Sequence, residues 1–173
     1  MRPTLIVLSG PPGTGKTTLA HRLAEHIGCP AISRDEIKEG MLSAALSTGA
    51  PAPGDLNLRT LPAFFAVLRV LLEAGVTTVA EAAFQHHVWQ PRLEPLMTSA
   101  DVRLIQCRTD EAAAHARISL RDSANPTRKA HDASEAHRLL SPDFVRLRLD
   151  VPSIDVDTTD GYSPGLDAVA RFA

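Results

Sequence analysis

A glycine-rich segment near the start of the chain has the residue types and spacing that bind phosphate. Residues Gly10–Thr17 match the pattern G-x-x-x-x-G-K-[ST] at every fixed position, directly after an apolar run. Glycines let backbone N–H groups converge on phosphate oxygens, and a following helix points its positive end at the same anion. We therefore expect a nucleoside triphosphate here, with Lys16 near its β- and γ-phosphates and the Thr17 hydroxyl on Mg²⁺. The residues predicted to bind the nucleotide are Gly10, Pro11, Pro12, Gly13, Thr14, Gly15, Lys16, Thr17 and Thr18.

An aspartate and a lysine follow the next short apolar segment, in the run Ser33-Arg34-Asp35-Glu36-Ile37-Lys38. The carboxyl ends of strands in an open α/β sheet face the ligand crevice, so we expect Asp35 to lie there. An aspartate near the γ-phosphate can accept the proton of an attacking hydroxyl. Lys38, three residues on, would share its helix face and hold an anionic group of the acceptor. The alternative is structural: Asp35 as a helix N-cap and Lys38 as its solvated partner.

A glutamate ends the third apolar segment, Val79-Ala80-Glu81. A carboxylate at this position can reach Mg²⁺ through water or hold the acceptor, as acids at the end of Walker-B strands do. We therefore predict Glu81 as a metal and substrate residue. The alternative is that Glu81 only caps the turn that follows.

Two arginines four residues apart, Arg117 and Arg121, lie in a segment expected to be helical. On a helix they share one face, where their guanidinium groups could stack on a base and bind phosphate oxygens. The polar residues 122–133 follow, and we predict that they form a small lid. The alternative is a solvated helix face, which is the commoner role of such a pair.

Alternating strands and helices are expected to position these side chains. The patterns predict strands at residues 4–9, 30–33, 76–80, 102–107 and 153–157. They predict helices at residues 16–27, 35–47, 58–74, 89–99, 111–121, 134–140 and 164–172. This alternation favours an α/β fold, a three-layer α/β/α sandwich around a parallel sheet. Residues 1–173 are expected to form one P-loop domain.

Taken in order, these motifs resemble the small P-loop kinases of the predicted ATP-dependent kinase group. The phosphate loop, Asp35 with Lys38, Glu81, the arginine pair and the stretch Asp157-Thr158-Thr159-Asp160 carry the resemblance. That group is similar to the kinase module of polynucleotide 5′-kinases, to zeta toxins and to chloramphenicol phosphotransferase. The resemblance implies a five-stranded parallel sheet of nucleoside-kinase type, with the second and third strands on one side of the first.

The resemblance also implies roles for individual residues. Asp35 would be the general base and Lys38 a contact to a substrate phosphate. Arg117 would stack on adenine, Arg121 would contact the phosphates during catalysis, and Thr158 would lie in the loop beside the base. Lys38 stands where polynucleotide kinases usually have arginine, and a lysine cannot form the bidentate fork, which disfavours recognition of a nucleic-acid 5′ end.

Composition narrows the class of protein further. A net charge of −2 gives no general attraction to nucleic acid, and one Trp and one Tyr leave few rings to stack bases. The apolar run before Gly10 is too short to cross a membrane, so we expect a cytoplasmic protein without a membrane partner. Neither Asn57 nor Asn125 is followed by Lys, so the Asn-Lys-x-Asp motif of GTPase switches is absent.

The sequence thus predicts an enzyme that uses ATP and Mg²⁺ to phosphorylate a small-molecule hydroxyl. Two alternatives stay open, namely a polynucleotide or oligonucleotide 5′-kinase and a nucleotide-dependent regulatory ATPase. The identity of the acceptor, the choice between ATP and GTP and the oligomeric state stay open as well.

Overall fold

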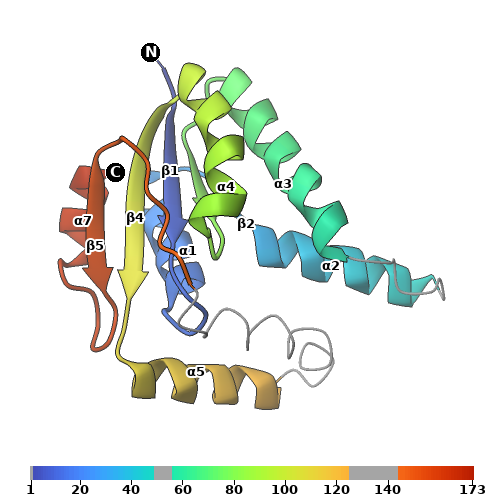
Figure 1. The fold of residues 1–173 in the computed structure, drawn as a ribbon, viewed down its shortest axis with the longest axis vertical. Coiled ribbons are helices and arrows are strands. Elements are labelled where there is room, and N and C mark those ends of the chain that lie inside the picture. The colour runs from blue at the N-terminus through green and yellow to red at the C-terminus, as the bar shows by residue number, and fades with distance from the viewer. Residues whose placement is uncertain (1, 49–55, 125–143) are drawn as a thin grey trace.

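A five-stranded sheet forms the centre of the molecule, with the strands in the order β2-β3-β1-β4-β5 (Figure 1). The computed structural model describes residues 2–48, 56–124 and 144–173. Every pair of neighbouring strands is parallel. The order places β2 and β3 on one side of β1, as the resemblance implied, so the predicted nucleoside-kinase-like sheet is confirmed.

The elements alternate along the chain. The strands are β1 (Thr4–Ser9), β2 (Ala31–Ser33), β3 (Thr78–Glu81), β4 (Asp101–Arg108) and β5 (Ser153–Asp157). The helices are α1 (Lys16–Ile27), α2 (Arg34–Ser47), α3 (Leu56–Glu73), α4 (His86–Leu93), α5 (Glu111–Ala124) and α7 (Leu166–Phe172), with a 3₁₀ helix, η1 (Glu94–Thr98), after α4.

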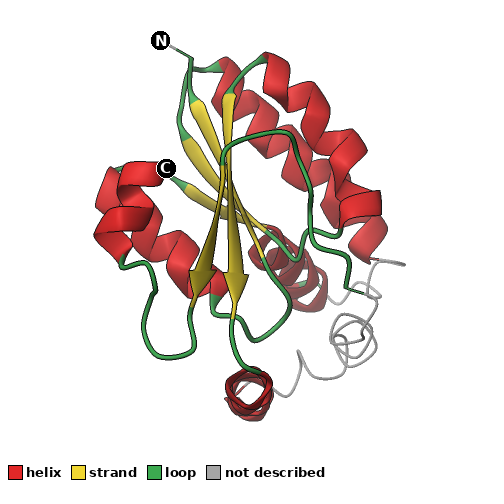
Figure 2. Cartoon of the chain, turned by 60° about the vertical axis from the view of Figure 1, so that its left-hand side comes forward, coloured by secondary structure: helices red, strands yellow, loops and turns green. Residues whose placement is uncertain are grey.

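Helices cover both faces of the sheet, which gives the predicted three layers (Figure 2). One core lies between the sheet and α3, α4 and η1, with Phe64, Phe84 and Leu104 fully or almost fully buried. The other lies between the sheet and α1 and α7, with Leu19 and Val169 buried. Apolar side chains on both faces of β1 explain why that segment is a continuous apolar run. Residues of β1, β4 and α3 thus hold the sheet rigid beneath the site.

The sequence placed β1, α1 and β5 correctly, but the segment predicted as one helix at residues 89–99 starts earlier and is divided in two. The helix α4 begins at His86, and the chain tightens into a 3₁₀ helix at Glu94 with Pro95 in its first turn. The N–H of His86 donates to Val145 O at 3.1 Å, and this contact with a distant segment fixes where α4 starts. Such a contact leaves no local signal in the sequence.

Two predicted features lie mainly outside the described residues. The helix expected at 134–140 is one, and most of the lid expected at 122–133 is the other. Residues 122–124 form the last turn of α5. In the described ranges, no helix combines the length and the hydropathy that crossing a membrane requires.

Candidate active site

The phosphate loop joins β1 to α1 and packs directly against α5. Gly13 and Gly15 have φ angles of +79° and +66°, in the left-handed region that favours glycine. A Cβ atom on Gly13 would lie 2.6 Å from Ala114 O and 2.9 Å from Ala114 Cα. The sequence therefore has glycine here for two reasons, the backbone conformation and the close approach of α5. Figure 1 places α5 below the carboxyl ends of the strands, next to the loop.

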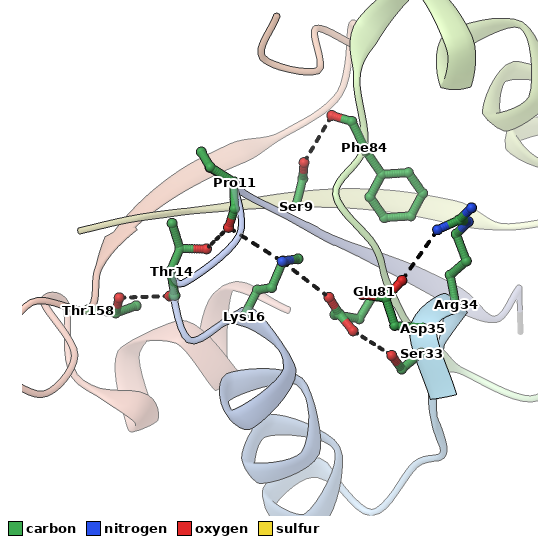
Figure 3. A network of polar contacts seen from close by, with 10 residues as sticks. All are labelled: Ser9, Pro11, Thr14, Lys16, Ser33, Arg34, Asp35, Glu81, Phe84 and Thr158. Atoms are coloured by element: carbon green, nitrogen blue, oxygen red, sulfur yellow. Dashed lines mark hydrogen bonds and ion pairs between the residues drawn. The ribbon is translucent and has the colours of Figure 1, made fainter. Parts of the chain in front are cut away.

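Lys16 extends from the first turn of α1 across the loop toward the end of β3 (Figure 3). Its Nζ donates to Pro11 O at 3.4 Å and lies 3.9 Å from Glu81 Oε1. The side chain is only 9% exposed. The loop ammonium and the Glu81 carboxylate are therefore brought together at the end of β3.

Glu81 is a buried carboxylate with one oxygen satisfied and one available. Its side chain is 1% exposed, and Ser33 Oγ donates to Oε2 at 2.6 Å. Among the described residues, Oε1 has no hydrogen-bond partner, and the Lys16 ammonium lies 3.9 Å from it. Burial raises the pKa of Glu81 above its ordinary value, while Lys16 and then Ser33 oppose that rise. Such a carboxylate is stabilised by a further cation.

This donor set fits a magnesium ion held mostly by water and phosphate. Mg²⁺ takes oxygen ligands, and kinase-type sites commonly supply only one or two from the protein. Glu81 Oε1 is an unsatisfied carboxylate oxygen beside the phosphate loop, and Thr17 is close enough to lower the pKa of Glu81 by a hydrogen bond. Within the described ranges, no cluster of three or more His, Cys, Asp or Glu residues makes an all-protein metal site.

Asp35 lies in the first turn of α2, two residues after the end of β2. Its side chain is 42% exposed, and its Oδ1 lies 3.3 Å from Arg34 Nη1. Arg34 also donates to Asn57 Oδ1 at 2.8 Å, and its guanidinium lies 6.0 Å from the Trp89 ring centroid. Lys38 is buried on the same helix. The base candidate is thus open to solvent in the first turn of α2, beside the Arg34 guanidinium.

The charges of Asp35 and Glu81 interact across the site. Asp35 is one of the charges that raise the pKa of Glu81. The carboxyl ends of β2 and β3 adjoin, because Ser33 pairs with Glu81 in the sheet. The two predicted carboxylates therefore share one edge of the sheet with Lys16.

Arg117 lies on the opposite side of the phosphate loop and binds backbone oxygens. Its guanidinium donates to Thr158 O at 2.6 Å, Thr159 O at 3.1 Å and Gly13 O at 3.4 Å. The Thr158 hydroxyl donates to Thr14 O at 2.8 Å, so the loop after β5 is joined to the phosphate loop. Arg117 therefore joins α5 to the phosphate loop and to the loop after β5, beside the predicted site of the nucleotide base. Arg121, one helical turn further along α5, is partly exposed.

Three residues of this site were not predicted from the sequence. They are Ser33, which binds Glu81, and Arg34 and Asn57, which flank Asp35. A serine before a helix predicts an N-cap, and the sequence holds no signal for the different partner that this hydroxyl has. Asn57 approaches Arg34 only because α3 packs against α2.

A family model described as an AAA domain, AAA_33, matches residues 5–150, which is most of the chain. The chain belongs to the AAA_33 family. Curated relatives cover shorter regions. tRNA dimethylallyltransferase 1 of Bacteroides fragilis is 38% identical over 92 residues, 49% of this chain and 30% of that protein. Adenylate kinase of Chlamydia caviae is 37% identical over 51 residues, 30% of this chain and 24% of that protein. This AAA_33 chain thus spans less than a third of the length of these relatives.

Solved structures match the AAA_33 chain over nearly its whole length. A candidate kinase from Chloroflexus aurantiacus has a TM-score of 0.80 at 24% identity, covering 99% of this chain and 96% of that one. The APS kinase CysC of Mycobacterium tuberculosis, with AMPPNP and APS, has a TM-score of 0.64 at 16% identity, covering 98% and 94%. A chain of the Pnkp1/Rnl/Hen1 RNA repair complex has a TM-score of 0.58 at 17% identity, covering 86% of this chain and 50% of that one. The fold is therefore that of small P-loop kinases.

Proposed function

We propose that this protein transfers the γ-phosphoryl group of Mg·ATP to a hydroxyl group of a small-molecule acceptor. The observation that carries the proposal is the meeting of Lys16 Nζ and Glu81 Oε1 at 3.9 Å, at the sheet edge where Asp35 also lies. Family and fold support nucleotide-dependent phosphotransfer in general. The acceptor and the residue roles come from the chemistry of the site.

The phosphate loop would hold the triphosphate. Its amides surround the β- and γ-phosphates, and Lys16 leaves Pro11 O to neutralise the charge that develops there. Thr17 would bind Mg²⁺ directly and Glu81 through a water molecule. A bound Mg²⁺ would supply positive charge that offsets the negative charge of the phosphates during transfer. On the far side, Arg117 and Thr158 would border the base, and Arg121 would reach the phosphates from α5.

The transfer step needs a base on the acceptor side, and we assign that role to Asp35. The acceptor oxygen attacks the γ-phosphorus, the bond from that phosphorus to the β–γ bridging oxygen breaks, and ADP leaves. The proton of the hydroxyl passes to the Asp35 carboxylate. Arg34 Nη1 lies 3.3 Å from Asp35 Oδ1 and would hold that carboxylate in place at the start of α2. Lys38 would bind an anionic group of the acceptor.

The principal alternative acceptor is the 5′-hydroxyl end of a nucleic acid. Recognition of an unpaired end usually involves stacking of bases on exposed aromatic rings. The only Trp of the sequence, Trp89, is 6% exposed and packs against Phe84 at a centroid distance of 4.6 Å. Its burial therefore favours a small molecule over a polynucleotide.

A transfer screen tests the proposal. Labelled ATP and Mg²⁺ are incubated with the protein and with sugars, nucleosides, aminoglycosides or 5′-hydroxyl oligonucleotides, next to a reaction without acceptor. We expect label on a small-molecule hydroxyl and only slow release of phosphate without acceptor. Label on the oligonucleotide alone would make the protein a 5′-kinase, and hydrolysis unaffected by any acceptor would indicate a regulatory ATPase.

Lys16→Ala is the negative control for the screen. The variant loses the ammonium beside the phosphates, so ATP affinity and transfer should both fall. Equal calorimetric affinity of ATP for both forms would refute the nucleotide site at this loop.

A further inference from the structure

Ser33 stands at the N-cap of α2, yet its hydroxyl does not cap the helix. Serine at this position normally accepts a hydrogen bond from a backbone N–H of the first turn. In this chain no side-chain capping bond forms, and Ser33 Oγ instead donates to Glu81 Oε2 at 2.6 Å. Both residues are buried, at 3% and 1% exposed. The start of α2 therefore lacks the stabilising capping bond, because the Ser33 hydroxyl is bound to the Glu81 carboxylate.

The contact decides which way the Glu81 carboxylate faces. The last torsion of a glutamate side chain has broad minima, so the carboxylate can rotate unless a partner holds it. Ser33 holds Oε2, and Oε1 is left 3.9 Å from Lys16, without a hydrogen-bond partner among the described residues. Figure 3 shows Glu81 between Ser33 on one side and Lys16 on the other.

We infer that Ser33 is a positioning residue for cation binding: its hydroxyl fixes Glu81 Oε2 so that Oε1 faces the phosphate loop. The inference rests on the proposed function, in which Glu81 is the metal-side carboxylate. Partners that orient a metal-binding carboxylate commonly change metal affinity by about 10- to 100-fold when removed. Ser33 also lies two residues before Asp35 in the chain, at the same edge of the sheet.

The test measures metal binding and not turnover. Mn²⁺ affinity is measured by electron paramagnetic resonance on the protein saturated with AMPPNP, for wild type, Ser33→Ala and Ser33→Thr. We expect Ser33→Ala to weaken Mn²⁺ about tenfold or more and Ser33→Thr, which keeps the hydroxyl, to stay close to wild type. If Ser33→Ala fails to fold, Ser33→Cys keeps a similar shape with a weak donor and should also lose affinity.

Ser9→Ala is the matched control. Ser9 ends β1, the strand that pairs with β3 on the side away from β2. It is 1% exposed, and its hydroxyl donates to Phe84 O at 3.2 Å. Its loss removes a buried hydroxyl of the same kind without touching Glu81. The free energy of unfolding should fall to a similar extent in Ser9→Ala and Ser33→Ala, while only Ser33→Ala weakens Mn²⁺. Equal weakening in both would overturn the inference.

Glu81→Gln separates the inference from the proposed function. If Ser33 acts through Glu81, the double variant Ser33→Ala/Glu81→Gln binds Mn²⁺ no more weakly than Glu81→Gln alone. Wild-type affinity in Ser33→Ala beside weakened Glu81→Gln would overturn only the role of Ser33. Wild-type affinity in Glu81→Gln would remove Glu81 from the metal site and the role of Ser33 with it. Failure of AMPPNP to bind at all would refute the nucleotide site itself.

Discussion

At the scale of single residues, the site depends on two carboxylates in different surroundings. Glu81 is 1% exposed, whereas the Asp35 side chain is 42% exposed and lies beside the Arg34 guanidinium. A buried carboxylate is suited to a fixed cation, because desolvation penalises its charge until a cation arrives. An accessible carboxylate is suited to take a proton from an entering hydroxyl. The roles that we propose for the two carboxylates differ for this reason.

Asp35→Asn tests the role proposed for the carboxylate on the acceptor side. The amide keeps the shape of the side chain but cannot accept the hydroxyl proton, so transfer should fall by about 10²- to 10⁴-fold. ATP affinity should be retained, because Lys16 and the backbone amides of the phosphate loop are unchanged in the variant. Transfer is measured by product formation and affinity by calorimetry.

Glu36→Gln is the control for Asp35→Asn. Glu36 is the next residue, and its side chain is 48% exposed. Its Oε1 lies 2.6 Å from Nε2 of the exposed His21. Removing a surface charge of this kind should leave transfer within about twofold of wild type. Undiminished turnover in Asp35→Asn would remove Asp35 from the chemistry.

At the scale of elements, the phosphate loop depends on α5 as its outer wall. The Gly13 position touches the backbone of Ala114, and Arg117 of the same helix reaches the loop after β5. A shift of α5 would therefore move both the phosphate amides and the wall of the base site.

Gly13→Ala should separate α5 from the loop. Its Cβ would lie 2.6 Å from the Ala114 carbonyl, which is backbone and cannot rotate away, and the φ of +79° adds about 1–2 kcal/mol of strain. Gly75→Ala has a φ of +77° but meets no atom of the described residues within 4 Å, so it carries the backbone cost alone. We expect a larger loss of unfolding free energy, and weaker ATP binding, only in Gly13→Ala. Urea unfolding measures the free energy of unfolding, and calorimetry measures ATP affinity. Equal losses in the two variants would refute the role of α5 as the outer wall of the phosphate loop.

The sequence predicted those elements whose signals are local. The strand before Gly10 and the helix after Lys16 have the observed bounds, because an apolar run and a glycine stop specify each one. Glu81 was located because an acid ends an apolar strand. The Ser33–Glu81 and Arg34–Asn57 bonds were missed, because each joins residues 48 and 23 positions apart that only the packed sheet and helix pair bring together.

At the scale of the whole molecule, the fold buries the Glu81 carboxyl group, and this burial reduces the stability of the free protein. A parallel sheet with helices on both faces brings the carboxyl ends of β1, β2 and β3 to one edge. That arrangement buries Glu81 beside the phosphate loop, and burial outweighs the attraction of Lys16 in setting its pKa. Ionising Glu81 in the free protein is therefore unfavourable, and a bound cation would offset that cost.

Glu81→Gln should make the free protein more stable at neutral pH. Burial raises the pKa of Glu81 above its ordinary value of 4.5, so from that pH upward the folded state holds the proton more tightly than the unfolded state. The contribution of Glu81 to the free energy of unfolding therefore falls as the pH rises through this window and is smallest above the folded pKa. Glutamine never ionises, and its side-chain oxygen can still accept the hydrogen bond from Ser33. The variant therefore does not lose unfolding free energy as the pH rises through this window.

Urea unfolding between pH 4 and pH 8, in EDTA and without nucleotide, measures the effect. The difference between Glu81→Gln and wild type should be near zero at the acid end and grow as the pH rises, because every other titrating group is common to both proteins. Glu36→Gln, which removes an exposed carboxylate, should show no such growth. A Glu81→Gln variant less stable than wild type at neutral pH would mean that the Lys16 ion pair outweighs burial. The carboxylate would then stabilise the free protein, and no cation would be needed to relieve it.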